Sequence, residues 1–132
     1  MDKRKNDGAS IMVVDDEEDT RTMLYELLSS EGYIVATAKD ALEALKAMSR
    51  SRFDLVVSDL RMPMMEGIEF LDKIKAAAPS TKAIILTAYG NHPLYLDALE
   101  KGAADMLLKP VKNAELLRTV ERVLAERGGR RG

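Results

Sequence analysis

Four apolar runs in this chain end in side chains that can hold or neutralise a phosphoryl group. Asp15 and Asp16 follow the first run, Asp59 the second, Thr87 the third and Lys109 the fourth. Carboxylates bind Mg²⁺ and can act as nucleophiles, a hydroxyl can bond a phosphoryl oxygen, and an ammonium opposes the charge of that group. These side chains form one site only if the fold brings the ends of the four runs together.

The apolar runs have the composition of strands in a parallel sheet. Ile11–Val14, Leu55–Val57 and Ala83–Leu86 are β-branched or aliphatic, as strands buried on both faces are. Tyr33–Thr37 and Asp105–Leu108 have more polar ends, which suit the edges of a sheet. The sequence therefore predicts five strands, three central and two at the edges.

Helical spacing of apolar residues fills the intervals between and after these strands. The clear helical stretches are Met23–Leu28, Leu42–Met48, Ile68–Ile74 and Leu116–Leu124, whereas Leu94–Lys101 is shorter and less regular. Asp40 followed by Glu43 is a capping-box pattern, and Gly32, Gly102 and Gly128 are expected to end helices. Strand and helix thus alternate five times along the chain.

Strict alternation predicts the α/β class, with helices on both faces of a doubly wound parallel sheet in a three-layer (βα)5 arrangement. The most apolar strands occupy the middle if the strand order is 2-1-3-4-5, the order of flavodoxin-like folds. In such a sheet ligands bind beyond the carboxyl ends of the strands. The four phosphoryl-type positions are therefore expected in a single pocket.

Length and composition restrict the function. With 132 residues the chain makes one domain, expected over residues 11–127, with a flexible segment at 1–10 and a flexible tail or linker start at 128–132. A net charge of -2 gives no basic excess for nucleic acid, and the absence of cysteine excludes disulfides and thiolate zinc sites. No signal peptide or membrane-spanning run is visible, so a cytoplasmic location away from the membrane is expected.

Each candidate residue taken alone has a simpler interpretation. Asp15 and Asp16 are typical of helix caps, Asp59 is typical of turns after strands, and the single histidine, His92, suits an exposed helix start. A cis peptide at Lys109–Pro110 would aim the lysine inward, although the base rate favours trans. The pattern gains its meaning from the joint occurrence of these residues.

Taken together, the motifs resemble the receiver domain of two-component response regulators over about Ile11 to Arg127. The motifs are Asp15-Asp16, the segment Asp59-Leu60-Arg61-Met62-Pro63-Met64-Met65-Glu66-Gly67, Thr87-Ala88 and Lys109-Pro110. The resemblance implies a signalling domain that catalyses only its own phosphorylation and dephosphorylation. A sensor histidine kinase or a histidine phosphotransfer protein would supply the phosphoryl group from a phosphohistidine.

The resemblance also implies roles for single residues. Asp59 would be the phosphoacceptor, and Thr87 and Lys109 would contact the phosphoryl group. The cofactor would be Mg²⁺, held by Asp16, Asp59 and the backbone carbonyl of Arg61, with Asp15 acting through water. Phosphorylation would then alter the surface formed by the fourth helix, the fifth strand and the fifth helix.

One position departs from the receiver pattern. Receivers usually carry an aromatic switch residue three positions before the lysine, where this chain has Met106. Tyr89 follows Thr87 by two positions and is hypothesised to gate the site instead. The switch residues are thus expected to be Thr87, Tyr89 and Met106.

Alternative functions remain open on the sequence. A phosphorylation-independent interaction scaffold would account for Met106, whereas a Mg²⁺-dependent aspartyl phosphohydrolase of the haloacid dehalogenase type would need an aspartate where Arg61 stands. Two interpretations explain a further group of residues equally well. They could form the interface of a homodimer that assembles on phosphorylation, or they could belong to a solvated helix face. The group is Leu94, Leu99, Asp105, Leu107, Arg118 and Arg122.

Overall fold

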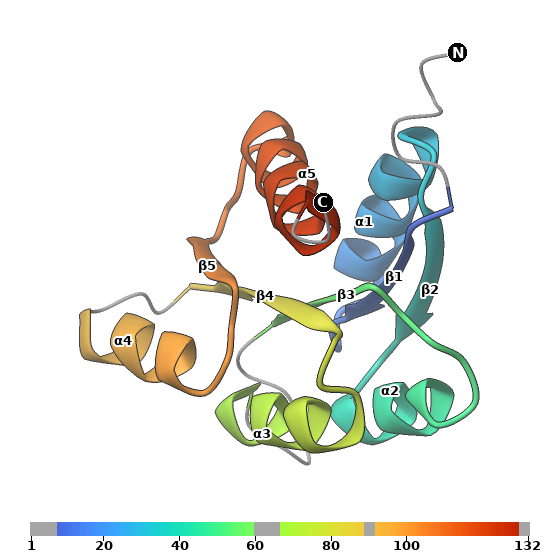
Figure 1. Ribbon diagram of the computed structural model, residues 1–132. Helices are drawn as coiled ribbons and strands as arrows, with labels where there is room; N and C mark the ends of the chain where they lie inside the picture. Colours follow the sequence, from blue (N-terminus) through green and yellow to red (C-terminus); the bar gives the residue numbers. More distant parts are fainter. Residues whose placement is uncertain (1–7, 60–66, 89–91, 130–132) are drawn as a thin grey trace.

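The computed structural model describes residues 8–59, 67–88 and 92–129, which form a five-stranded parallel sheet covered by helices on both faces (Figure 1). The elements are β1 (Ser10–Val14), α1 (Glu18–Ser30), β2 (Ile34–Ala38), α2 (Ala41–Met48), β3 (Leu55–Asp59), α3 (Gly67–Ala77), β4 (Lys82–Thr87), α4 (His92–Glu100), β5 (Asp105–Leu108) and α5 (Asn113–Gly129). The strand order β2-β1-β3-β4-β5 confirms the predicted (βα)5 fold.

The core lies on both sides of the sheet, because successive residues of a strand point to opposite faces. On one face Val13 packs in a cluster with Leu28 of α1 and Val120 of α5. On the other face Met12 packs in a cluster with Phe70 of α3. Figure 1 shows the same division, with α1 and α5 over one face and α2, α3 and α4 over the other. No helix in the described ranges combines the length and apolarity that a membrane span requires.

Local signals set three of the helix ends. Asp40 caps α2 by accepting the Glu43 N–H at 2.8 Å, as the capping-box pattern predicts, and Glu43 Oε1 returns a bond at 2.7 Å to the N–H of Lys39, one residue before the N-cap. Gly32 and Gly102 adopt positive φ values of 97° and 108°, where a side chain would be strained. The expectation for Gly128 is wrong, because α5 continues to Gly129. Glycine adopts helical dihedrals as readily as left-handed ones, so its presence alone does not end a helix.

Tyr33 makes the fold sensitive to alkaline pH. Burial, followed by the charges of Glu121 and Glu31, raises the pKa of Tyr33 to about 12. A folded-state pKa above the unfolded value of about 10 contributes stability that is fully present below pH 10 and is lost as the pH rises toward 12. We expect wild type to lose about 2–3 kcal/mol more than Tyr33→Phe over this interval in urea unfolding. If the free energy of unfolding of the two proteins fell in parallel as the pH rose, the raised pKa of Tyr33 would be contradicted.

Candidate functional site

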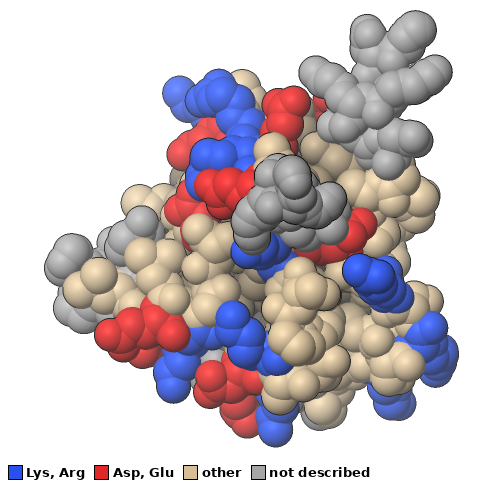
Figure 2. All heavy atoms as spheres, viewed as in Figure 1, with Lys and Arg blue, Asp and Glu red and all other residues tan. Residues whose placement is uncertain are grey.

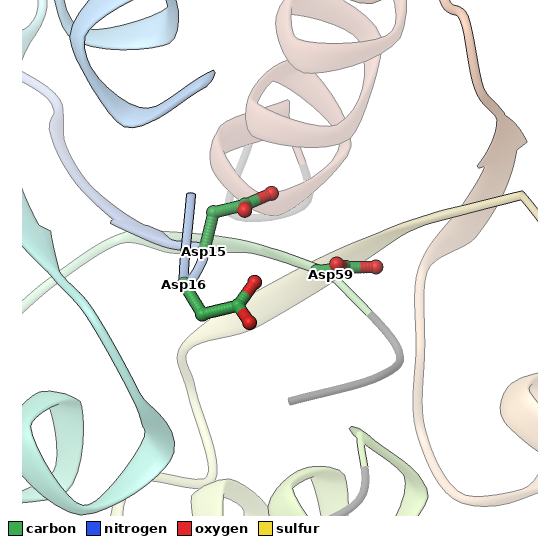
Figure 3. A group of neighbouring side chains, drawn as sticks. All are labelled: Asp15, Asp16 and Asp59. Carbon is green, nitrogen blue, oxygen red and sulfur yellow. The ribbon is translucent and has the colours of Figure 1, made fainter. Parts of the chain in front are cut away.

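Three carboxylates meet at the carboxyl end of the sheet. Asp15 and Asp16 follow β1, and Asp59 is the last residue of β3, the strand that pairs with β1. One carboxylate oxygen from each residue lies within 4.8 Å of the others. Figure 3 shows the three side chains gathered at this edge. The predicted convergence of Asp15, Asp16 and Asp59 is therefore present in the structure.

The three carboxylates differ in exposure. Asp15 is 1% exposed, the Asp59 side chain is 14% exposed, and Asp16 is open to solvent. Asp15 Oδ1 accepts the Glu17 N–H at 2.9 Å, which fixes the turn into α1. Carboxylates this close repel one another, so the site favours a cation. The helix-cap interpretation does not describe this pair, because Glu17 is the N-cap residue of α1.

Lys109 supplies a positive charge to the cluster. Its Nζ lies 3.3 Å from Asp15 Oδ2 and 3.4 Å from Asp59 Oδ2. Burial alone would lower the pKa of Lys109, but the charges and hydrogen bonds of Asp15 and Asp59 overcome that effect and raise the pKa above its ordinary 10.5. The resulting stability is present below pH 10.5 and is lost only as the pH rises through the raised value. Lys109 therefore carries a full charge at neutral pH.

The peptide bond between Lys109 and Pro110 is not the isomer that is commoner before proline. The Lys109–Pro110 peptide is cis, not trans. The trans preference of a bond before proline is only about 0.5–1 kcal/mol, so the surrounding structure easily decides the isomer. The Lys109 N–H also donates to the Thr87 carbonyl oxygen at 2.8 Å, which joins the ends of β4 and β5.

Thr87 ends β4 in register with Leu108, and its side chain is fully buried. The neighbouring residue Leu86 is in register with Asp59, so β3, β4 and β5 end side by side. The structure thus brings Thr87 to the same edge as the carboxylates and the lysine. Its hydroxyl lies under the surface and not on an open pocket wall.

Met106 occupies a core position. It is 9% exposed and packs in a cluster with Ile85 of β4 and Ala98 of α4. The space between β5 and α4 is therefore filled by a flexible thioether side chain, which adapts its shape more readily than an aromatic ring. Leu107 points to the opposite face and is 8% exposed, so it belongs to the core and not to the suggested dimer surface.

Four predicted residues cannot be fully placed from the structure. Arg61 and Tyr89 lie outside the described residues, and of His92 and Leu94 only the backbone, in α4, is described. The carbonyl-ligand role of Arg61 and the gating role of Tyr89 remain predictions.

Arg21 is a site residue that the sequence analysis missed. Its Nη1 donates to the Asp15 carbonyl oxygen at 2.8 Å, so a charged group on α1 holds the backbone that carries two of the carboxylates. In the sequence Arg21 is one of several charged residues at the start of a helix. Nothing in that pattern distinguishes it from a solvated side chain.

Replacing Arg21 by lysine is expected to weaken Mg²⁺ binding. Arg21→Lys keeps the charge but removes the planar donor group, so the change isolates the positioning of Asp15 and Asp16. A charged hydrogen bond contributes about 1.5–3 kcal/mol, and partial compensation by lysine leaves an expected loss of about 3–10-fold in affinity, measured by titration calorimetry. The control is Arg118→Lys on the exposed surface of α5. Equal affinities in both variants would contradict the positioning role.

Known proteins share this fold and much of the sequence. The response regulator receiver domain model matches residues 11–121. The transcriptional regulatory protein ZraR of Escherichia coli (strain K12) is 41% identical over 120 residues, which are 91% of this chain and 27% of ZraR. The chemotaxis protein CheY of Listeria monocytogenes is 35% identical over 113 residues, which are 85% of this chain and 95% of that protein.

A solved structure agrees with the sequence relatives. The beryllofluoride-activated NtrC4 receiver domain dimer has a TM-score of 0.85 and 35% identity, and the match covers 89% of this chain and 98% of that one. The chain spans about a quarter of the length of ZraR but nearly all of CheY. It belongs to the response regulator receiver domain family.

Proposed function

We propose that Asp59 accepts a phosphoryl group from the phosphohistidine of a sensor histidine kinase or a histidine phosphotransfer protein. The observation that carries this proposal is the ammonium of Lys109, 3.4 Å from Asp59 and 3.3 Å from Asp15, inside a group of three carboxylates. Such a site combines a nucleophile, oxygen ligands and a charge that can bind phosphate.

The transfer follows from the chemistry of these groups. A carboxylate oxygen of Asp59 attacks the phosphorus atom and forms a P–O bond, while the P–N bond to the imidazole breaks and the imidazole nitrogen keeps the electron pair. The product is an acyl phosphate. Lys109 is able to move from the carboxylates to an oxygen of the transferred group and neutralise part of its charge.

The donor set fits Mg²⁺. The described cluster offers only carboxylate oxygens, which magnesium prefers to the nitrogen and sulfur ligands typical of zinc. Asp16 and Asp59 would hold the ion together with the backbone carbonyl of Arg61, and Asp15 would act through water. When bound, Mg²⁺ supplies charge neutralisation on the oxygens of the transferring group.

The proposed output is a change of the surface formed by α4, β5 and α5. A phosphoryl group adds charge and acceptor oxygens beside the buried hydroxyl of Thr87. A shift of Thr87 would open space next to Met106, which packs between β5 and α4. Tyr89 is proposed to gate the site, and a homodimer of phosphorylated chains is one output, as in the activated NtrC4 receiver.

Acetyl phosphate tests the proposal. Incubation of the chain with acetyl phosphate and Mg²⁺ is expected to add the mass of one phosphoryl group, and hydroxylamine should remove it because acyl phosphates are reactive mixed anhydrides. Omitting Mg²⁺ should prevent the addition. The absence of an adduct under all conditions would support the phosphorylation-independent scaffold, and steady hydrolysis of unrelated small phosphoesters would support a phosphohydrolase.

A further inference from the structure

β2 is one of the two edges of the sheet, because β1 is the only strand that pairs with it in the part of the chain that the structure describes. The Ile34 N–H donates to the Ala9 carbonyl at 2.9 Å, and the Ala38 carbonyl accepts the Asp15 N–H at 3.2 Å, so both ends of β2 face β1. The backbone polar groups of successive strand residues point to opposite sides. The residue in the middle, Ala36, therefore also faces β1.

Val35 and Thr37 consequently direct their N–H and C=O groups away from the sheet. The N–H groups on either side are already bonded, since the Tyr33 N–H donates to the Leu28 carbonyl at 3.4 Å and the Lys39 N–H donates to Glu43 Oε1 at 2.7 Å. Within the described residues, the outward groups of β2 are therefore the N–H and C=O of Val35 and of Thr37, on either side of Ala36.

β2 lacks three of the features that commonly block pairing at an exposed edge: charged side chains, proline and a bulge. Proteins protect exposed edges with charges, prolines or bulges. At the opposite edge, Asp105 opens β5 and pairs with Arg122, and Pro110 follows two residues after the strand ends. The sequence of β2, Ile34–Ala38, contains no charge and no proline, and all five residues pair in unbroken register with β1.

Exposed apolar side chains lie on both faces beside this edge. Ile34 is 62% exposed, Tyr25 of α1 is 45% exposed and Leu42 of α2 is 43% exposed. Tyr25 lines the same surface groove as Thr37, which places it beside the strand. Figure 2 shows a stretch of uncharged surface on the side of the molecule where β2 lies in Figure 1.

We propose that β2 pairs antiparallel with β2 of a second copy of this chain, around a twofold axis at Ala36. In this register Val35 faces the partner's Thr37 and Thr37 faces the partner's Val35. Both are hydrogen-bonded pairs of an antiparallel ladder, so the outward groups of the two copies form four mutual hydrogen bonds. Ala36 faces the partner's Ala36 in a non-hydrogen-bonded pair, where Cα atoms approach to about 4.5 Å.

A second copy is the occupant because the edge is complementary to itself. A twofold axis requires antiparallel strands and the same patch on both chains, and the spacing of Val35 and Thr37 about Ala36 meets both conditions. The axis also brings Lys39, at one end of β2, toward the partner's Glu31 at the other end. The interface is small, so the expected dissociation constant is on the order of 10–1000 µM.

Disulfide trapping tests the register, since the chain contains no cysteine. In Ala36→Cys the two thiols lie at the axis, within the Cα separation of about 4.4–6.8 Å that a disulfide spans. In Thr37→Cys the two Cα atoms are about 9 Å apart, beyond that reach. At a chain concentration on the order of 100 µM, we expect Ala36→Cys to form covalent dimers at least tenfold faster than the more exposed Thr37→Cys.

The backbone provides the second test. Thr37→Pro in the Ala36→Cys chain removes an outward N–H that the β1 ladder does not use, whereas Thr37→Val keeps that N–H and the shape of the side chain. Slower trapping with proline and unchanged trapping with valine are expected, with urea unfolding to show that both variants fold. Equal trapping of the two cysteine variants, trapping of neither, or no effect of proline would overturn the proposal. A chain that sediments as a monomer at every concentration would also overturn the proposal. In that case a strand of another protein would be the candidate partner for the β2 edge.

Discussion

Asp59→Asn is expected to abolish the magnesium-dependent phosphate adduct that acetyl phosphate produces on the wild-type chain. The amide has nearly the shape of the carboxylate but is a poor nucleophile, so no acyl phosphate forms. The variant also removes one of three mutually repelling carboxylates beside Lys109, which favours folding. Intact mass spectrometry checks the result, and urea unfolding confirms that the variant is folded.

A matched change on the surface separates this effect from a general loss of charge. Asp72→Asn removes a carboxylate whose side chain is 59% exposed and pairs only weakly with Lys101 at 3.7 Å. This control should keep the adduct at the wild-type level. An adduct of undiminished amount on Asp59→Asn would place the acceptor elsewhere and overturn the assignment.

Lys109→Met is expected to separate magnesium binding from phosphoryl transfer. Methionine fills the space of the aliphatic stem but leaves Asp15, which is 1% exposed, without its ammonium partner. The free energy of unfolding without Mg²⁺ should fall by about 1–3 kcal/mol, less than for a fully buried pair because the Lys109 side chain is 25% exposed. Magnesium should bind several-fold more tightly, since a competing cation has been removed.

Lys109→Met should slow phosphoryl transfer, although it strengthens magnesium binding. Loss of one charged hydrogen bond to the phosphoryl group, about 1.5–3 kcal/mol, corresponds to a rate about 10–100-fold lower. Adduct formation with acetyl phosphate at saturating Mg²⁺ measures this rate. Lys112→Met, three residues further along and exposed, is the control. Weaker magnesium binding together with an unchanged transfer rate would contradict the role given to Lys109.

The fold was predictable because its strands carry their own signal. Ile11–Val14 and Ala83–Leu86 are apolar throughout since they are covered on both faces, and the polar residue Asp105 at the start of β5 reflects an edge position. The helix end at Gly102 was also visible, because it needs a positive φ. Gly128 needs no positive φ because it lies inside α5, so the same residue type predicted the end of that helix wrongly.

The site was predictable only in part. Asp15, Asp59 and Lys109 each follow or end an apolar run, and parallel strands end at one edge of the sheet, so their positions in the sequence predicted that they would meet there. The contact of Arg21 with a backbone carbonyl depends on the path of the turn before α1, and no side-chain pattern encodes that path. The burial of Thr87 likewise depends on the packing of segments distant in the sequence around the end of β4, which its own residue type does not reveal.

The ion pair between Asp15 and Lys109 has a consequence for the newly made protein. Its two residues are 94 positions apart, and Lys109 follows Asp59 by 50 positions. At a synthesis rate of about 5–20 residues per second, roughly 3–10 s pass between the addition of Asp59 and that of Lys109. During that time the growing chain contains Asp15 and Asp59 but not the lysine that neutralises them. A fragment that ends before β5 lacks Lys109, so under the proposed function we expect it to accept a phosphoryl group far more slowly and to be silent rather than permanently active.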